Sequence, residues 1–197
     1  VWTKPGVSKS VLVSHPQTTD DFNSYTLGLQ WQFNHNPVNT HWSLNERRGW
    51  LALKALKAAT LRESRNMLTQ KCMGYLSTAT VLLDFSALAD GQRGGLFCTG
   101  SLYNGIGISR EEGKNYLYLE KNGDVQQVKM VSGKKIYLRV MLDAKKNRCQ
   151  LFYSFDNRNF ILCGDAYSLK FGDWKGARVG LGIGGKCYFD WFNYDFN

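Results

Sequence analysis

Short runs in which apolar and polar residues alternate dominate this chain, and this period of two is typical of half-buried β-strands. Residues 27–33 alternate apolar with small or polar side chains, and residues 136–142 do so less cleanly. Five further apolar runs have the length of a strand, at residues 50–53, 79–85, 149–155, 179–183 and 188–196. Roughly ten to fourteen short strands separated by turns predict an all-β protein, an antiparallel sandwich or barrel.

Asn122 and Gly123 join two of the apolar runs, residues 116–119 and 125–131. An Asn-Gly pair in this position is the strongest short signal for a β-hairpin. Only residues 51–65 have the composition of a helix, and two interpretations stay open for them: a short helix, or a strand that enters a loop. No repeat of 20 to 50 residues is visible, which argues against a propeller.

The composition supports one large folded domain, or at most two small ones. Hydrophobic residues make up 43% of the 197 residues, enough for a sizeable core, so a disordered chain is excluded. Aromatic residues at 14%, with 20 glycines and 3 prolines, favour strands and tight turns. No apolar run reaches about 18 residues, so we expect no membrane partner.

The net charge of +9 requires acidic partners to be considered. The basic residues are dispersed beside turns, with no RNA-binding or zinc-finger signature, so we expect no nucleic-acid partner. The chain has five cysteines, an odd number, and no two of them form a CxxC motif. They are therefore expected to be small buried hydrophobic residues rather than zinc ligands or a disulfide framework.

The first residues differ in character from the rest. Pro5 and Pro16 stand among Ser, Thr, Lys and Val, so residues 1–19 read as a linker, or as an extended strap lying on another surface. Residues 20–197 would then form the folded module. The chain does not begin with Met and shows no signal peptide, and we expect an excised domain of a longer polypeptide.

Motifs for catalysis or nucleotide binding are weak. Residues 180–185 spell GxGxxG, but the chain ends soon afterwards in an aromatic run, so the glycines are expected to let two sheets approach closely. No HExxH or GxSxG occurs. The neighbouring Asp20 and Asp21 suit a structural calcium ion together with Asp190, although solvated or turn-forming carboxylates are the simpler interpretation.

The densest polar and aromatic cluster is residues 31–37, with residues 41–43 behind it. Aromatic rings stack on the apolar faces of sugar rings, and amides form directional hydrogen bonds with sugar hydroxyls. The cluster therefore favours a carbohydrate site, and a core Trp followed by an Asn-rich turn is an equally good interpretation.

At this cluster a family resemblance appears. Asp20-Asp21-Phe22-Asn23-Ser24 and the run from Leu27-Gly28 to Asn36-Pro37 resemble the opening of the C-terminal module of glycoside hydrolase family 43 enzymes, the β-xylosidases and α-L-arabinofuranosidases. Further segments resemble later parts of that module, in order: Trp42-Ser43-Leu44, Gly49-Trp50-Leu51, Arg65 to Lys71, Tyr153-Ser154-Phe155-Asp156 and Tyr188-Phe189-Asp190-Trp191-Phe192. The resemblance implies a concanavalin A-like jelly-roll sandwich of two antiparallel sheets with a concave face.

The resemblance also implies a set of site residues. The loop of Asn34, His35 and Asn36 would face a ligand or the catalytic propeller, with Phe33 and Trp42 as apolar contacts. Asn66 and Gln70, four residues apart on one strand, would extend the polar row, while Arg65 would fall on the opposite face of a regular strand. We expect this loop and Trp42 at one rim of the concave face, held by Leu27, Leu29, Trp31 and Phe33 in or near the core.

The expected function is a non-catalytic accessory module of a hemicellulose-degrading glycosidase. It would bind xylan or arabinoxylan oligosaccharides, or complete the active site of an upstream catalytic propeller in the same polypeptide. Two alternatives stay open: a purely structural module, and a stand-alone sandwich enzyme, for which the sequence offers no carboxylate-rich strand. We expect no cofactor beyond the calcium ion, and a secreted or periplasmic location, with the cytoplasm as the alternative.

Overall fold

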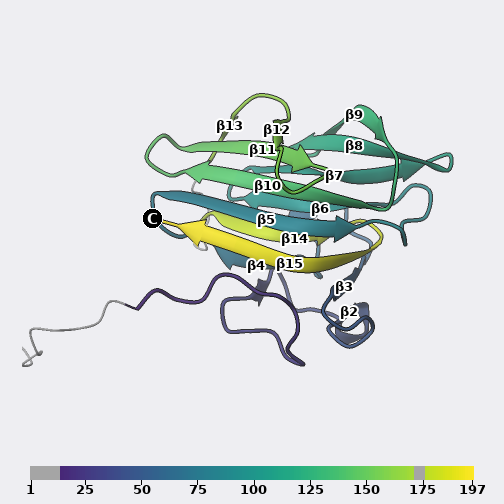
Figure 1. Ribbon diagram of the computed structural model, residues 1–197, viewed down its shortest axis with the longest axis horizontal. Coiled ribbons are helices and arrows are strands. Elements are labelled where there is room, and N and C mark those ends of the chain that lie inside the picture. The colour runs from purple at the N-terminus through teal and green to yellow at the C-terminus, as the bar shows by residue number, and fades with distance from the viewer. Residues whose placement is uncertain (1–13, 171–175) are drawn as a thin grey trace, which may run out of the picture.

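Two antiparallel β-sheets stacked face to face make up the protein (Figure 1). The computed structural model describes residues 14–170 and 176–197. One sheet consists of β1 (Gln32–Phe33), β4 (Leu68–Lys71), β6 (Arg93–Thr99), β7 (Tyr103–Glu111), β8 (Lys114–Lys121), β9 (Asp124–Val131) and β14 (Arg178–Ile183). The other consists of β2 (Trp42–Ser43), β3 (Leu51–Lys54), β5 (Leu76–Asp84), β10 (Lys135–Asp143), β11 (Arg148–Ser154), β12 (Ile161–Leu162), β13 (Tyr167–Ser168) and β15 (Lys186–Phe196).

The order of strands is β1-β4-β14-β6-β7-β8-β9 in the seven-stranded sheet and β12-β11-β10-β5-β15-β3-β2 in the eight-stranded sheet, where β13 pairs with β11. The prediction of an all-β sandwich of two antiparallel sheets is therefore confirmed. Two short 3-10 helices, η1 (Asn39–His41) and η2 (Leu61–Glu63), complete the elements. In the described part of the chain, no helix is long and apolar enough to cross a membrane.

Alternate residues of each strand point inward and form the core between the sheets. Leu96 and Ile106 of one sheet and Val81 and Leu138 of the other are fully buried there. All five cysteines are free, and four of them are buried, as expected. The fifth, Cys72, is only partly buried.

The Asn122–Gly123 hairpin is confirmed. Lys121 pairs with Asp124, and the two residues between them have φ angles of 50° and 102°. Both angles lie in the left-handed region that Asn and Gly adopt most readily, which is why this pair can reverse the chain between β8 and β9.

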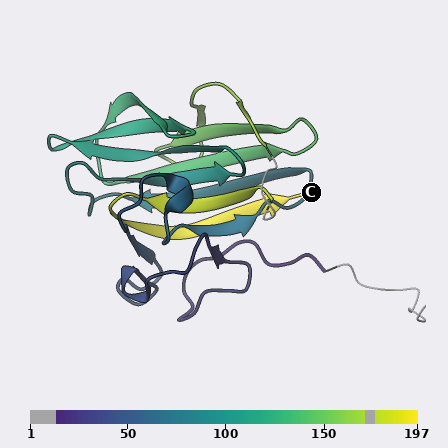
Figure 2. The same cartoon turned by 180° about the vertical axis from the view of Figure 1, so that it is seen from behind.

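Residues 51–65 form a strand that enters a loop, so the helix interpretation is wrong. After β3, the chain crosses the outer face of the seven-stranded sheet as a loop that contains η2 (Figure 2). There Leu61 and Met67 pack with Phe97, Tyr103 and Tyr118 in a second hydrophobic cluster. Burying the apolar side of residues 51–65 against a sheet does not require helical periodicity.

The glycines of β14 make room for this second cluster. A Cβ atom added at Gly182 would lie 3.0 Å from both Leu61 and Phe97, and one at Gly180 would lie 2.9 Å from Met67. The expectation that these glycines bring two sheets together is wrong, because they face the outer cluster. Strand β15, not a helix, follows them, so the dinucleotide interpretation fails as expected.

The predicted strand over residues 27–33 is much shorter than its pattern suggests. Only Gln32–Phe33 pair with a neighbour, and a turn closed by the bond from Trp31 N to Gly28 O (3.1 Å) precedes them. Leu29 sits at this turn and is fully exposed, so its predicted place in or near the core is wrong. Trp31 is buried, as predicted.

Residues 14–19 run along the outside of the sandwich. The Thr18 hydroxyl donates to Tyr194 O (2.6 Å), and the Gln70 amide donates to Thr18 O (2.7 Å). This contact has the form of the expected strap, although residues 1–13 of the predicted linker lie outside the described residues. Figure 1 shows this segment on the same side of the molecule as β2.

Candidate functional site

The Asn34–Pro37 loop, residues 34–37, follows β1 directly and is fixed by side-chain and main-chain hydrogen bonds to residues 62–67. The Asn34 amide donates to Arg62 O (2.7 Å) and Ser64 O (3.3 Å), and Asn34 N donates to Met67 O (2.9 Å). Arg65 Nε donates to Asn36 O (2.9 Å). A loop held by this many directed bonds keeps its position without a ligand, as a preformed site requires.

His35 adds a hydrogen bond to the same set. Its Nε2 lies 2.9 Å from Arg62 O, and a carbonyl oxygen can only accept, so Nε2 carries the proton. The imidazole is exposed, and its second nitrogen is left for an outside partner. Asn36 is exposed as well, and within the described chain its side chain makes no hydrogen bond.

These residues border an open hollow of about 970 Å³. Phe33, Asn34, His35 and Asn36 line it together with Glu63 and Arg65. The position of Arg65 corrects an expectation: it precedes the strand β4 and reaches toward the Asn34–Pro37 loop, rather than pointing to the opposite face. The sequence could not show this, because the strand begins at Leu68, later than the pattern implied.

Trp42 lies beside this hollow without lining it. Its ring contacts Phe33 with centroids 5.4 Å apart, and its indole N–H reaches Asn39 Oδ1 (3.3 Å). Phe33 belongs to an edge strand of one sheet and Trp42 to an edge strand of the other, so this pair closes the sandwich at that edge. Both rings are half-buried, which leaves only part of each for contact with a ligand.

Asn66 and Gln70 are buried and engaged with the main chain. Asn66 pairs with both main-chain groups of Val38, accepting from N (3.1 Å) and donating to O (3.3 Å), and so holds the end of the Asn34–Pro37 loop. Asn66 precedes β4, so the strand does not place it in one row with Gln70. Gln70 lies instead in a neighbouring groove, described below.

The three calcium candidates, Asp20, Asp21 and Asp190, have different environments. Asp20 accepts hydrogen bonds from Trp31 Nε1 (2.7 Å) and from Phe22 N (2.8 Å), and Asp21 accepts from Asn23 N (3.1 Å). Burial raises the pKa of the half-buried Asp190. No three His, Cys, Asp or Glu side chains converge as metal ligands anywhere in residues 14–170 and 176–197. Asp20 and Asp21 each accept a hydrogen bond from the main-chain N–H two residues later, as the turn-forming interpretation predicts.

The comparisons with known proteins agree with this architecture. The family described as "Beta xylosidase C-terminal Concanavalin A-like domain" matches residues 19–195. The chain belongs to this family. Its members are the accessory C-terminal domains of family 43 glycoside hydrolases, so the predicted resemblance and the concanavalin A-like fold are both confirmed.

Relatives of this concanavalin A-like domain are longer proteins. A provisionally named beta-xylosidase of Xylanibacter ruminicola is 40% identical over 91% of this chain and 33% of its own length. A beta-xylosidase of Formosa agariphila is 34% identical over 94% of this chain and 36% of its own length. The chain therefore spans about a third of the length of these curated relatives.

Solved structures give the same result. A bifunctional GH43-CE protein of Bacteroides eggerthii has a TM-score of 0.84 and 27% identity, over 90% of this chain and 25% of that one. The GH43 protein BlXynB of Bacillus licheniformis has a TM-score of 0.77 and 28% identity, over 89% of this chain and 38% of that one.

Proposed function

We propose that this domain is a non-catalytic accessory module whose Asn34–Pro37 loop completes a sugar-binding active site on the catalytic domain of a longer xylosidase or arabinofuranosidase. The observation that carries the proposal is the set of hydrogen bonds between residues 34–38 and 62–67. These bonds fix the exposed imidazole of His35 and the main chain that carries the exposed amide of Asn36, and both groups line an open hollow. Such groups form the directional hydrogen bonds that sugar hydroxyls require.

The form of the hollow favours a shared site over strong binding by the module alone. The Asn34 amide is already bonded to the main chain, and Phe33 and Trp42 are half-buried against each other. A sugar held only here would leave most of its surface in water, whereas ligand sites enclose most of theirs. A second domain opposite the Asn34–Pro37 loop supplies the missing wall. The strap of residues 14–19 approaches on the same side of the sandwich (Figure 1).

The test is a double substitution, His35→Ala with Asn36→Ala, made in the 197-residue chain and in the longer enzyme. The free energy of unfolding should fall by no more than about 1.5 kcal/mol, because the only hydrogen bond lost within the described residues is that from His35 to Arg62 O. Turnover of an aryl xyloside or arabinoside by the longer enzyme should fall at least tenfold, since each lost hydrogen bond to a buried hydroxyl costs about 1–3 kcal/mol.

The matched control is Gln126→Ala with Gln127→Ala, two exposed amides on the distant edge strand β9. This control should leave both stability and turnover unchanged. If the loop variant melts several degrees earlier and keeps full turnover, the loop is a structural turn and the module only packs against its neighbour. Hydrolysis of xylan or β-glucan by the purified chain alone would overturn its non-catalytic role.

A further inference from the structure

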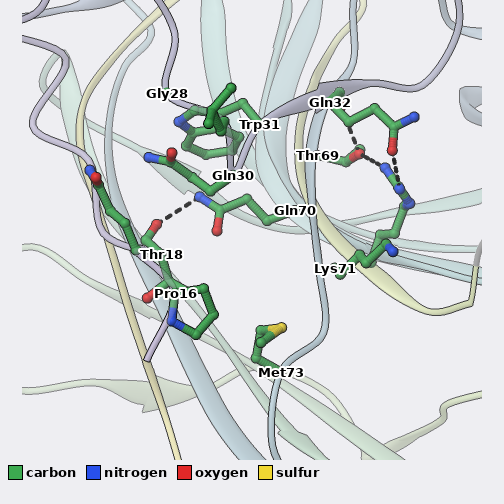
Figure 3. Close-up of a pocket in the computed structure, with 13 residues that line it drawn as sticks. Pro16, Thr18, Gly28, Gln30, Trp31, Gln32, Thr69, Gln70, Lys71 and Met73 are labelled. Atoms are coloured by element: carbon green, nitrogen blue, oxygen red, sulfur yellow. Dashed lines mark hydrogen bonds between the residues drawn. The ribbon is translucent and has the colours of Figure 1, made fainter. Parts of the chain in front are cut away.

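A groove of about 800 Å³ lies next to the hollow, between the strap and the edge of the seven-stranded sheet (Figure 3). Pro16 to Thr18 form one wall, and the turn from Gly28 to Gln32 forms another. Thr69, Gln70 and Lys71 of β4 and Arg178 of β14 complete the lining. No Asp or Glu is among its lining residues.

Arg178 brings to this groove a positive charge that no carboxylate of the described residues pairs with. The residue is only 5% exposed, its Nη1 donates to Thr69 Oγ1 (2.6 Å), and its Nη2 donates to Gln32 Oε1. Its buried Nε–H has no partner among the described residues, and none of their carboxylates forms an ion pair with it. Buried charges are normally paired, so a buried guanidinium without an acid indicates a site for an anion from outside.

Lys71 adds a second cation at the same place. It is the direct cross-strand neighbour of Arg178 in the pairing of β4 with β14, and directly opposed residues point to the same face of a sheet. Unlike Arg178, Lys71 is exposed, so its ammonium group reaches a ligand in the open groove.

Hydrogen bonds also fix the orientation of the amides that line the groove. Gln32 turns its oxygen toward Arg178, so its NH₂ group is left to donate. Gln30 has the reverse arrangement: its NH₂ group donates to Asp20 Oδ2 (3.2 Å), and its oxygen remains as an acceptor. Gln70 precedes Lys71 on β4 and so points to the opposite face of the sheet, where it is 2% exposed and donates to Thr18 O (2.7 Å). One end of the groove therefore offers cations and donors, and the other end offers an acceptor.

The groove also contains apolar surface beside these polar groups. Leu29 is fully exposed at the turn, and Trp31 and Met73 are also among the lining residues. Apolar side chains with a few oriented polar groups are the usual lining of a small-molecule site, and the volume lies within the usual range of about 300–1,000 Å³.

We propose that this groove binds a sugar acid, a pyranose unit that carries a carboxylate. The carboxylate lies against Lys71, the Gln32 NH₂ group and the charge of Arg178, and a ring hydroxyl donates to the oxygen of Gln30. The groove shares Trp31 and Gln32 with the hollow beside the Asn34–Pro37 loop, but it contains no residue of that loop and does not depend on the function proposed for it.

The test compares glucuronic acid with glucose, which has the same ring but no carboxylate, by calorimetric or NMR titration of the 197-residue chain. Glucuronate should bind at least about tenfold more tightly than glucose, because hydrogen bonds to charged groups are the stronger ones. Raising the ionic strength should weaken the binding of glucuronate and not that of glucose.

Lys71→Gln is the decisive variant, since an exposed substitution leaves the fold intact. It should weaken glucuronate binding about tenfold, whereas the control Lys121→Gln, an exposed lysine at the end of β8, should have no effect. Equal binding of glucose and glucuronate, or an unchanged affinity in Lys71→Gln, overturns the proposal.

Two further outcomes also decide against a sugar ligand. Acetate that binds as tightly as glucuronate shows that the groove recognises charge alone. Glucuronate that binds the 197-residue chain and not the longer enzyme shows that a carboxylate of a neighbouring domain occupies the groove.

Discussion

The outer face of the seven-stranded sheet has two halves that differ in how they cover and bond a buried charged residue. In the closed half, the loop with η2 packs Leu61 and Met67 over Phe97 and Tyr118. In the open half, the groove leaves the sheet uncovered around Arg178. Glu120 of β8 is the buried charged residue of the closed half, and Arg178 is that of the open half.

The two buried groups differ in their partners. Arg178 donates to Thr69 and Gln32, whereas neither carboxylate oxygen of Glu120 has a hydrogen bond within the described residues. Arg93, 3.6 Å away, is the charge nearest to Glu120, and burial raises the pKa of Glu120 against its influence. Burial also lowers the pKa of Arg178, so both groups are shifted toward their neutral forms, and the difference between them is that Arg178 keeps two hydrogen bonds and Glu120 keeps none within the described residues.

The largest expected effect lies in the closed half. Phe97 is 2% exposed and its ring lies over Gly105, where a Cβ atom would overlap with it. Phe97→Ala removes the centre of the outer cluster and should lower the free energy of unfolding by about 3–5 kcal/mol, measured by urea denaturation. Phe155→Ala, at a half-exposed ring, is the control and should cost much less. Equal losses would show that the loop does not close this half.

In the open half, Arg178→Lys keeps the positive charge and removes the planar guanidinium, whose two terminal nitrogens donate to Thr69 and Gln32. A single ammonium group cannot reach both Thr69 Oγ1 and Gln32 Oε1 in the same geometry. The loss of these bonds should lower the free energy of unfolding by about 1–2 kcal/mol in urea denaturation at pH 7. An unchanged stability would mean that the two hydrogen bonds of the Arg178 guanidinium do not stabilise this part of the sheet.

Glu120→Gln should act in the opposite direction. Because burial raises the folded pKa of Glu120, the native state binds more protons than the unfolded state just above the ordinary carboxyl pKa. The wild type therefore loses stability as the pH rises through that interval, and the neutral amide does not. The variant should gain about 1 kcal/mol relative to wild type at pH 7 and less at pH 4, in denaturation curves at both values. A loss at pH 7 would show that the ion pair with Arg93 outweighs burial.

Glu46 lies outside both halves. Its substitution should have the smallest effect on the free energy of unfolding, with the sign opposite to that of Glu120→Gln. Hydrogen bonds from Lys186 and Lys54 lower its pKa from 4.5 to about 2. Its contribution to stability is complete above pH 4.5 and is lost as the pH falls toward 2. Glu46→Gln should therefore destabilise at pH 7 by less than about 1 kcal/mol, and this difference should vanish near pH 2. Acid-unfolding curves that run parallel for variant and wild type would contradict the pairing.

Much of the fold could be predicted from local pattern. Strand periodicity gave the two-sheet class, and Asn122–Gly123 gave the β8–β9 hairpin with its positive φ angles. These features depend on neighbours in the sequence, so the sequence shows them directly. Residues 33–36 were also identified as candidate site residues before the structure placed them on one hollow.

The pattern was misleading where burial depends on distant segments. Leu29 has the correct spacing for a core strand and is nevertheless fully exposed, because a turn from Gly28 to Trp31 lifts it away from the sheet. Gly180 and Gly182 resemble a glycine-rich motif, and their role is to accommodate side chains of the loop that contains Leu61 and of Phe97.

Most of the strands, the hairpin, the family and the polar Asn34–Pro37 loop can be read from the sequence, because each is marked by residues close together in the chain. Which charged residues are buried, and what they face, depends on how distant strands pair. Arg178 and Lys71 are more than a hundred residues apart and become neighbours through the pairing of β14 with β4. Gln32 of β1 and Thr69 of β4 are paired across the sheet and bond the same guanidinium. Hydrogen bonding across a sheet joins residues regardless of their separation in the chain, so the groove could be found only in the folded molecule.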